Sequence, residues 1–378
     1  MIDNVTPHQY YMAQAIKLAH RAIYITHPNP RVGCVLVKQG QVIAEGFTQP
    51  AGDPHAEAVA LAKAGEAAKG ATAYVTLEPC SHTGRTPPCA DALIKAGVSS
   101  VYIAMEDPNP RVSGRGIARL QAAGIEVVSG ILESEAIALN PGFIKRMLEG
   151  IPFVRLKMAT SLDGRTAMAS GESQWITGPE SRRDVQFWRA QSDAILTGIG
   201  TVLVDDPSLT VRLSAEALGI DTKVRQPTRV ILDSQLRCPP SAKLLGLPGK
   251  TLIYTQNNAP ETIQALERAG AEVVLLDSTS HSRAGLSMTA VLSDLAHREI
   301  NEVHTEAGSR ICGSLLEAGL VDELLLYMAP HLLGSDAMGA FHLPQLKTMQ
   351  DRINLDIKDI RAIGEDWRII ARLGQIER

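Results

Sequence analysis

Hydrophobic and polar positions along the first 150 residues change period repeatedly, which predicts helices and strands in alternation. The predicted helices are 7–23, 54–64, 87–96, 116–123 and 133–147, and the predicted strands are 32–38, 42–47, 71–77, 99–105 and 125–129. Thr6-Pro7, Asp53-Pro54 and Thr86-Pro87 each place a capping residue before a proline, which favours a helix start. This alternation indicates a sheet layered with helices.

The pattern breaks at Gly150-Ile151-Pro152, where we place a domain boundary between residues 1–147 and 151–378. In the second part, the predicted strands are 153–159, 194–197, 229–232, 251–255, 272–276, 302–305 and 323–328, and the predicted helices are 181–191, 259–269, 288–297 and 310–318. Residues 214–226 and the tail after Phe341 are the least informative. We find no internal repeat.

Composition limits the classes of protein that fit. The 378 residues are 45% hydrophobic and 21% charged, as in globular proteins. No apolar run reaches the roughly 18 residues of a transmembrane helix. The start lacks the features of a signal peptide, so we expect a cytoplasmic protein. The net charge is −4, and residues 1–147 hold 13 basic and 12 acidic residues, so neither a membrane nor a nucleic acid is an expected partner.

The candidate chemistry begins with cysteine. Five cysteines in a long chain with no sign of secretion favour metal or catalytic use over disulfides. His55-Ala56-Glu57, Pro79-Cys80 and Cys89 offer one imidazole and two thiolates, the three protein ligands of a catalytic zinc. Glu57 is then the candidate for moving protons. We place Cys89 in the first turn of a helix, where the helix dipole favours a thiolate.

This set matches the zinc-deaminase signature H-x-E…P-C-x-x-C except that eight residues, not two, separate the cysteines. A structural zinc site or unrelated buried thiols are the alternatives, and His82 is an alternative ligand. Cys34 is expected to be a small buried residue and Cys238 a loop residue.

Longer motifs extend the match. They are His27–Cys34, Pro54–Ala58 and Thr76–Cys89 in the first part, and Ser161–Arg165, Gly171–Thr177, Thr201–Thr210 and Glu306–Gly308 in the second. Over nearly the whole chain, the sequence resembles the bifunctional riboflavin-biosynthesis deaminase/reductase family, of which the long cysteine spacer is typical. The resemblance implies an α/β chain with an N-terminal cytidine-deaminase-like α/β/α domain and a C-terminal dihydrofolate-reductase-like α/β domain.

The resemblance also implies two reactions. The first domain would use Zn²⁺ to deaminate 2,5-diamino-6-(5-phosphoribosylamino)pyrimidin-4(3H)-one by hydrolysis. The second would use NADPH to reduce the ribosyl chain of 5-amino-6-(5-phosphoribosylamino)uracil to ribityl. Family members associate through the reductase domain, so a homodimer is expected. A deaminase of nucleic-acid bases and a non-catalytic protein with a structural zinc are the competing interpretations.

By the same resemblance, each site residue has an implied role. Zinc ligands would be His55, Cys80 and Cys89, with Glu57 catalytic. Residues near NADPH would be Ala159, Trp175, Thr201, Asp205, Ser234, Gly308, Ser309, Arg310, Ile311, Cys312, Gly313 and Ser314. Residues near the ribotides would be Asn29, the stretch His82–Thr86, Ser173, Arg189, Leu209, Arg212 and Glu306.

The residues themselves say less about the second site. Gly198-Ile199-Gly200 does not complete a dinucleotide-binding G-x-G-x-x-G. Gly308 at a predicted strand end, before a helix, is able to bind phosphate, but it is also an ordinary turn between a strand and a helix. Arg189 and Arg212 suit a phosphate or are solvated arginines. Trp175 is equally a core residue, and Asn29-Pro30 equally a plain turn.

Overall fold

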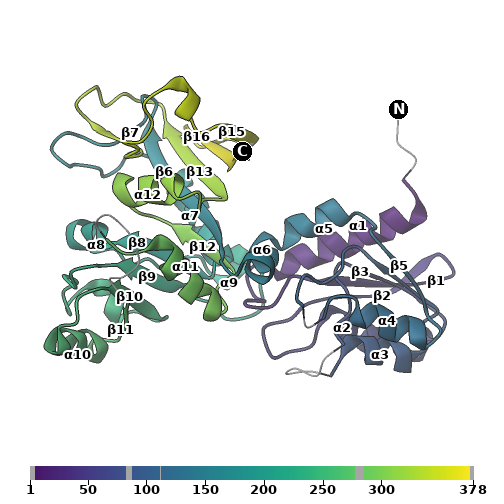
Figure 1. The fold of residues 1–378 in the computed structure, drawn as a ribbon. Helices are drawn as coiled ribbons and strands as arrows, with labels where there is room; N and C mark the ends of the chain where they lie inside the picture. The colour runs from purple at the N-terminus through teal and green to yellow at the C-terminus, as the bar shows by residue number, and fades with distance from the viewer. Residues whose placement is uncertain (1–4, 82–86, 111, 277–284, 375–378) are drawn as a thin grey trace. The chain divides into compact units, whose positions relative to one another are not determined.

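The computed structural model describes residues 5–81, 87–110, 112–276 and 285–374. The chain divides into two compact units, Met1–Gly150 with Gly219–Lys223, and Ile151–Leu218 with Val224–Arg378. Each unit is built around its own sheet (Figure 1). Among the described residues, no helix is both long and apolar enough to cross a membrane.

The first unit contains a five-stranded sheet in the order β2-β1-β3-β4-β5. Its strands are β1 (Gly33–Lys38), β2 (Gln41–Phe47), β3 (Thr72–Val75), β4 (Ser100–Ile103) and β5 (Glu126–Ser129). β1 is antiparallel to β2 and β3, whereas β3, β4 and β5 are parallel. The amino-terminal end of β1 and the carboxyl ends of β3 and β4 therefore share one edge of the sheet.

Helices cover both faces of this sheet. They are α1 (Pro7–Ala19), α2 (Ala56–Ala64), α3 (Cys89–Ala96), α4 (Arg115–Ala122), α5 (Glu133–Leu139) and α6 (Pro141–Glu149), with 3-10 turns η1 (His20–Ala22) and η2 (Gly65–Ala68). α1 and α5 lie on one face, and α2, α3 and α4 on the other (Figure 1). The predicted α/β/α layering is confirmed.

Helix starts differ from the predictions at two prolines. Thr6 caps α1 as predicted, in a reciprocal capping box with Gln9. The prediction that Asp53-Pro54 starts α2 is wrong, because the N-cap residue is His55. The predicted start at Thr86-Pro87 is also displaced: Pro88 is the N-cap residue of α3, and Thr86 lies outside the described residues.

The single helix predicted for 133–147 is two helices. It breaks at Asn140, directly before Pro141, because proline lacks the N–H that a continuous helix needs and its ring clashes with the preceding turn.

The second unit contains a nine-stranded sheet in the order β11-β10-β9-β8-β12-β6-β13-β16-β15. The first seven strands of that order are parallel, and the last two form an antiparallel hairpin at one end. The strands are β6 (Phe153–Ser161), β8 (Ala194–Gly198), β9 (Thr228–Leu232), β10 (Thr251–Thr255), β11 (Glu272–Leu275), β12 (Glu302–Thr305), β13 (Glu323–Ala329), β15 (Leu355–Ile363) and β16 (Asp366–Leu373). β7 (Arg165–Ala167) and β14 (Met338–Gly339) form a separate pair.

Helices cover both faces of this sheet as well. They are α7 (Pro179–Gln191), α8 (Ile199–Asp205), α9 (Ala215–Leu218), α10 (Pro260–Arg268), α11 (Met288–His297) and α12 (Ser309–Glu317), with 3-10 turns η3 (Lys243–Gly246) and η4 (Met349–Asp351). α11 and α12 pack on one apolar cluster, while α8 with α10, and α7, pack on two others.

The main elements missed in this unit are α8 and the β15–β16 hairpin. A β-bulge between Ile357 and Asp359 shifts the alternation of β15 by one residue, so the strand does not follow a strict period of two. α8 begins directly after β8 and has only seven residues, too few to show helical periodicity.

We expect Gly33→Ala to destabilise the first unit, because α1 packs on β1 without room for a side chain. A Cβ at Gly33 would lie 1.9 Å from the carbonyl oxygen of Ala15. Such overpacking costs about 1–3 kcal/mol of unfolding free energy, measurable by urea denaturation. Gly200→Ala, where no atom lies within 4 Å of the added Cβ, is the control. Equal stability of the two variants would contradict the expected clash.

Candidate active sites

The three predicted metal ligands meet at one edge of the first sheet. The His55 Nδ1 atom lies 3.7 Å from Cys80 Sγ and 3.4 Å from Cys89 Sγ. All three ligand atoms lie within 4.8 Å of one another. One imidazole nitrogen and two sulfurs at this spacing fit a zinc ion with a position left for a further ligand.

Separate elements supply these ligands. His55 is the N-cap residue of α2, Cys80 follows β3, and Cys89 is the first residue of α3. The Cys89 backbone N–H donates to Cys80 Sγ over 3.3 Å, and the Ala90 N–H donates to the Cys80 carbonyl over 3.1 Å. The amino terminus of α3 thus holds the Cys80 segment in place.

The two thiols differ in acidity. The hydrogen bond from Cys89, and next the one with His55, lower the pKa of Cys80 to about 4. The same contact with Cys80, together with burial, raises the pKa of Cys89. The hydrogen bond between the two sulfurs therefore favours the charged form of Cys80 and the neutral form of Cys89.

Glu57 lies in the first turn of α2, one residue beyond the N-terminal residue of the helix. Its side chain is buried beside Cys80 and Cys89. Burial, and next the charge of Cys80, raise the pKa of Glu57 to about 7. A carboxyl group with this pKa is able both to take and to give a proton at neutral pH.

A short repeat flanks these residues, so the expectation of no internal repeat is wrong. Pro-Asn-Pro-Arg-Val occurs at 28–32, before β1, and at 108–112, after β4, and both ends belong to the edge that carries Cys80. The Asn29 N–H donates to the Thr26 carbonyl over 2.8 Å, and the Asn109 N–H donates to Asp107 over 2.8 Å. Asn109 therefore matches Asn29 in sequence, although the two N–H groups bond different partners.

The residues between the cysteines are described only in part. The predicted substrate stretch His82–Thr86, including the alternative ligand His82, lies outside the described residues. Cys34 is fully buried, as predicted, and Cys238 is a buried loop residue.

In the second unit, four of the predicted ribotide residues lie around one ion pair. Arg189 donates to both oxygens of Glu306, over 2.6 and 2.9 Å, and to the Thr210 carbonyl over 3.0 Å. Leu209 is buried next to Thr210. Arg212 is exposed; the partial burial of its guanidinium, and next the charge of Arg189, lower its pKa. Arg189 is buried and so is not a solvated arginine; Arg212 is the more accessible cation.

Two side chains in this cluster were not predicted. Burial lowers the pKa of Lys157 on β6, and the charges of Glu306 and Arg189 act on it. His304 on β12 is fully buried, with Nε2 3.4 Å from Glu306 Oε1. The sequence signal that could have identified both residues is a titratable side chain within a strand that is otherwise buried. Although burial opposes it, the charge of Arg189 holds the pKa of Glu306 well below its ordinary value.

Most of the predicted cofactor residues gather at the carboxyl edge of the parallel strands, the usual ligand edge of such sheets. They are Ala159 near the end of β6, Thr201 and Asp205 on α8 after β8, Ser234 after β9, and Gly308–Ser314 after β12. Gly308 is the N-cap residue of α12, and no atom lies within 4 Å of a Cβ built there. This open helix terminus suits a phosphate group.

The later residues of that stretch face inward. Cys312 is fully buried, and its thiol donates to the Ala307 carbonyl over 3.2 Å. A Cβ at Gly313 would lie 2.0 Å from the His342 carbonyl oxygen. Neither side chain position is therefore open to a ligand, which leaves the residues at the start of α12 as the better candidates.

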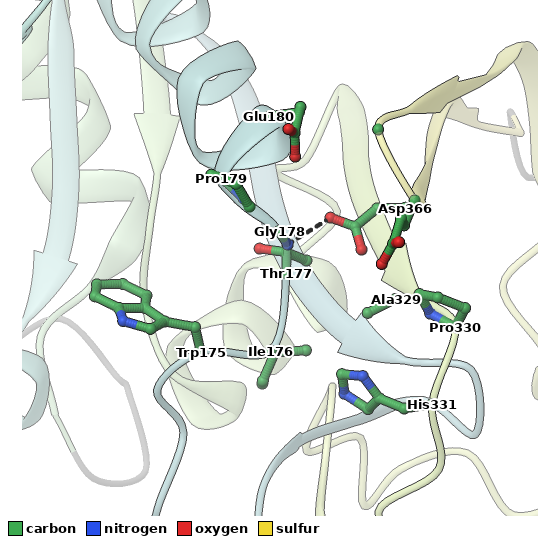
Figure 2. Close-up of a pocket in the computed structure, with 12 residues that line it drawn as sticks. Trp175, Ile176, Thr177, Gly178, Pro179, Glu180, Ala329, Pro330, His331 and Asp366 are labelled. Atoms are coloured by element: carbon green, nitrogen blue, oxygen red, sulfur yellow. Dashed lines mark hydrogen bonds between the residues drawn. The ribbon is translucent and has the colours of Figure 1, made fainter.

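Trp175 lies in the residues that precede α7. Its side chain is 68% exposed, which rules out a core role, and the Arg182 guanidinium stacks on it 4.5 Å from the ring centroid. Trp175 lines a pocket of about 620 Å³ formed by residues 175–180, 329–331 and 364–366 (Figure 2). Asp366 accepts a hydrogen bond from the Gly178 N–H over 2.8 Å in that pocket, and the indole points away from Asp366.

Ser173 precedes Trp175 by two residues and is half-buried. The neighbouring Gln174 donates a hydrogen bond to Asp205 over 3.3 Å. This bond connects the segment of Ser173 and Trp175 to α8 at the carboxyl edge.

Comparisons with known proteins match one family model to each unit. Residues 5–105 match the cytidine and deoxycytidylate deaminase zinc-binding region, and residues 152–369 match the RibD C-terminal domain. The chain is 53% identical to riboflavin biosynthesis protein RibD of Escherichia coli (strain K12) over 367 residues, which are 95% of this chain and 97% of that protein. It is 47% identical to the RibD of Haemophilus influenzae over 364 residues, 95% of each chain.

Solved structures agree over the full length. RibD of Acinetobacter baumannii (form 2) is 45% identical with a TM-score of 0.89, covering 98% of this chain and 100% of that one. A diaminohydroxyphosphoribosylaminopyrimidine deaminase/5-amino-6-(5-phosphoribosylamino)uracil reductase of Thermotoga maritima is 32% identical with a TM-score of 0.84, covering 97% and 99%.

We expect the purified protein to hold about one zinc ion per chain, since the three ligand atoms are already close together. Cys89→Ser should lose most of this zinc, because a hydroxyl is a far poorer zinc ligand than a thiolate. Metal analysis after dialysis measures the content, with Cys238→Ala as the control that changes a cysteine of the other unit. Full zinc content in Cys89→Ser would remove Cys89 from the ligand set.

Proposed function

Because the chain belongs to the RibD family of bifunctional riboflavin-biosynthesis enzymes, we propose that residues 1–147 carry its deaminase and residues 151–378 its reductase. The deaminase substrate is 2,5-diamino-6-(5-phosphoribosylamino)pyrimidin-4(3H)-one, whose amino group is exchanged for oxygen with release of ammonia. The reductase converts the ribosyl chain of 5-amino-6-(5-phosphoribosylamino)uracil to ribityl. Supporting this division, the two family matches fall on either side of Gly150.

The observation that carries the deaminase is the cluster of His55, Cys80 and Cys89 beside a buried Glu57. A zinc ion bound there supplies Lewis-acid activation of water. Glu57 accepts one proton from the attacking water and gives it to the ring nitrogen, and it then carries the proton of the added hydroxyl group to the departing amino group. Burial of Glu57 raises its pKa toward neutrality, which favours a group that both accepts and donates protons.

In the reductase, NADPH supplies the hydride. Ala159, Trp175, Thr201, Asp205, Ser234 and Gly308–Ser314 are the proposed cofactor residues. The pair of Arg189 with Glu306 forms the floor of the proposed ribotide site, and the more accessible Arg212 contacts the phosphate. Ser173 and Leu209 complete this site, and Asn29 is proposed to contact the ribotide of the deaminase.

The proposed partners are therefore small phosphorylated ribotides, not a nucleic acid or a membrane. All five cysteines are free, as expected in a reducing compartment. This supports the cytoplasm as the place of action.

We propose further that two chains associate through the hairpin β15–β16. Cross-strand pairing places Leu355, Ile357 and Ile360 of β15 opposite Leu373, Ala371 and Ile369 of β16. Paired residues share a face of the sheet, so this face of the hairpin is apolar along its length. Its members Leu355, Ile357, Ile360 and Trp367 are 43–56% exposed.

An exposed apolar sheet face beside an edge strand is typical of an interaction surface. β15 stands at the end of the sheet order and pairs with β16. A second copy offers the same apolar face and the same free strand edge, and a two-fold axis brings like surfaces together. This supports the homodimer that the family resemblance implies.

Glu57→Gln should abolish the overall reaction by removing its first step. Given the diaminopyrimidinone ribotide and NADPH, the wild-type protein should release ammonia and consume NADPH, and Glu57→Gln should be slower by at least about 10²-fold. Supplied directly with the aminouracil ribotide, the same variant should consume NADPH at the wild-type rate. Ammonia release at the wild-type rate in Glu57→Gln would refute the role of Glu57.

Ile360→Asp should convert the dimer to monomers, because it places a charge in the apolar face. Sedimentation velocity measures the oligomeric state directly. Asp356→Lys, on the opposite face of the same strand, is the control and should stay dimeric. A dimer that persists in Ile360→Asp places the interface elsewhere.

A further inference from the structure

The Glu78 carboxylate joins two separate parts of the deaminase site. Glu78 lies two residues before Cys80, just after β3, and its side chain is 3% exposed. One oxygen accepts the N–H groups of Asp107 and Gly114, over 3.2 and 3.0 Å. The other accepts those of Gly116 and Ile117, over 2.8 and 3.2 Å. One buried carboxylate thus receives four backbone hydrogen bonds from a single distant segment.

Two of these bonds cap a helix. The N–H groups of the first turn of α4 need partners, which an N-cap side chain usually provides. The N-cap residue of α4 is Gly114, which has no side chain, and the first turn holds no acidic residue. Glu78 bonds the second and third residues of the helix, Gly116 and Ile117, and places a negative charge at its positive end.

The other two bonds close a turn. The N–H groups of Asp107 and Gly114, at the two ends of the turn, bond the same oxygen of Glu78. Within it, Asn109 accepts from Val112 and Ser113, over 2.8 and 3.0 Å, through its carbonyl oxygen. The described residues of this turn, 107–110 and 112–114, are therefore held at both ends and at Asn109.

Packing brings the same two parts into direct contact. A Cβ at Gly116 would lie 2.0 Å from the Pro79 carbonyl oxygen, so α4 approaches the peptide that precedes Cys80 as closely as glycine permits. Arg119 of α4 donates to the Ser81 carbonyl over 3.0 Å, on the other side of Cys80. The Glu78 N–H also donates to the Met105 carbonyl over 3.0 Å, just before the turn.

The turn lies beside the proposed zinc site. Asp107 is buried, and its N–H bonds the carboxylate of Glu78, which lies two residues before Cys80. Asn109 in the same turn matches the proposed substrate residue Asn29 in sequence. A displaced turn would therefore alter the space in which the ribotide binds without removing a zinc ligand.

We propose that Glu78 is a positioning residue of the deaminase: it fixes the segment Asp107–Ile117 against the Pro79-Cys80 peptide and so determines ribotide affinity. The inference rests on the proposed deaminase function. Glu78 does not touch the substrate in this role. It acts through the turn beside the proposed zinc site.

Glu78→Gln tests the proposal with almost no change in size. The amide keeps one acceptor oxygen, but its NH₂ group cannot accept a hydrogen bond from the two N–H groups that face it. Two of the four hydrogen bonds are therefore lost. We expect the deaminase KM for the diaminopyrimidinone ribotide to rise at least tenfold with kcat changed less than about threefold. Zinc content and the reductase rate on the aminouracil ribotide should stay at wild-type values. Glu106→Gln, an exposed acid next to Asp107, is the matched control.

Glu78→Asp supplies the conservative variant. It keeps the charge and both acceptor oxygens on a shorter side chain, so its KM should lie between those of the wild type and Glu78→Gln. An unchanged KM in Glu78→Gln would overturn the proposal. So would a loss of zinc that accounts for the whole loss of activity, because Glu78 would then act on the ligands alone.

Hydrogen exchange gives a readout that needs no substrate and therefore separates this inference from the proposed function. In Glu78→Gln, peptides covering 107–117 should exchange faster than in the wild type, while peptides of β1 should not change. Equal exchange in 107–117 would refute the positioning role of Glu78, even if the protein proved to act on another substrate. Faster exchange in Glu78→Gln, in a protein whose wild type releases no ammonia, would support the positioning role of Glu78 and refute the proposed reaction.

Discussion

Three ligand atoms from three separate segments must lie within 4.8 Å of one another, and this requirement governs the first unit. Loops hold such a geometry only when other groups fix them, because buried backbone N–H and C=O groups in a loop need hydrogen-bond partners. Buried polar side chains provide these partners. Glu78 holds the segment after β4, and the Asn140 side chain both accepts from the Arg31 N–H and donates to the Arg31 carbonyl, over 2.7 and 2.9 Å. The edge that carries the metal ligands is therefore supported on both sides.

The second unit meets a similar requirement with charge. Arg189 is buried and Glu306 is half-buried, and an unpaired ion at either position would be costly. Their bidentate pairing offsets that cost and leaves Glu306 ionised at the carboxyl edge of the sheet. Lys157 and His304 add further titratable groups around the same carboxylate. This arrangement concentrates charge where the parallel strands end and where a phosphorylated ligand is proposed to bind.

Individual elements show which parts of the fold the hydrophobic pattern predicts and which it does not. Helix α11 was predicted to the residue, since Ser287 caps it and its apolar positions follow one period. The break at Asn140-Pro141 was missed, although proline in the middle of a predicted helix signals it. The bulge in β15 concealed the hairpin that we propose as the dimer interface, because one extra residue inverts the alternation that marks a strand.

The sequence by itself determined the ligand types, the family and the order of most elements, since these depend on residue identity and local spacing. Only the tertiary structure decided which groups share an environment. It showed that Arg189 forms an ion pair with Glu306, that Cys312 faces the core, and that Glu78 accepts hydrogen bonds from backbone groups 29–39 residues away. The physical reason is that the burial and the hydrogen-bond partners of a residue depend on its position in three dimensions. Residues far apart in the chain create them together, and no local pattern records which residues will meet.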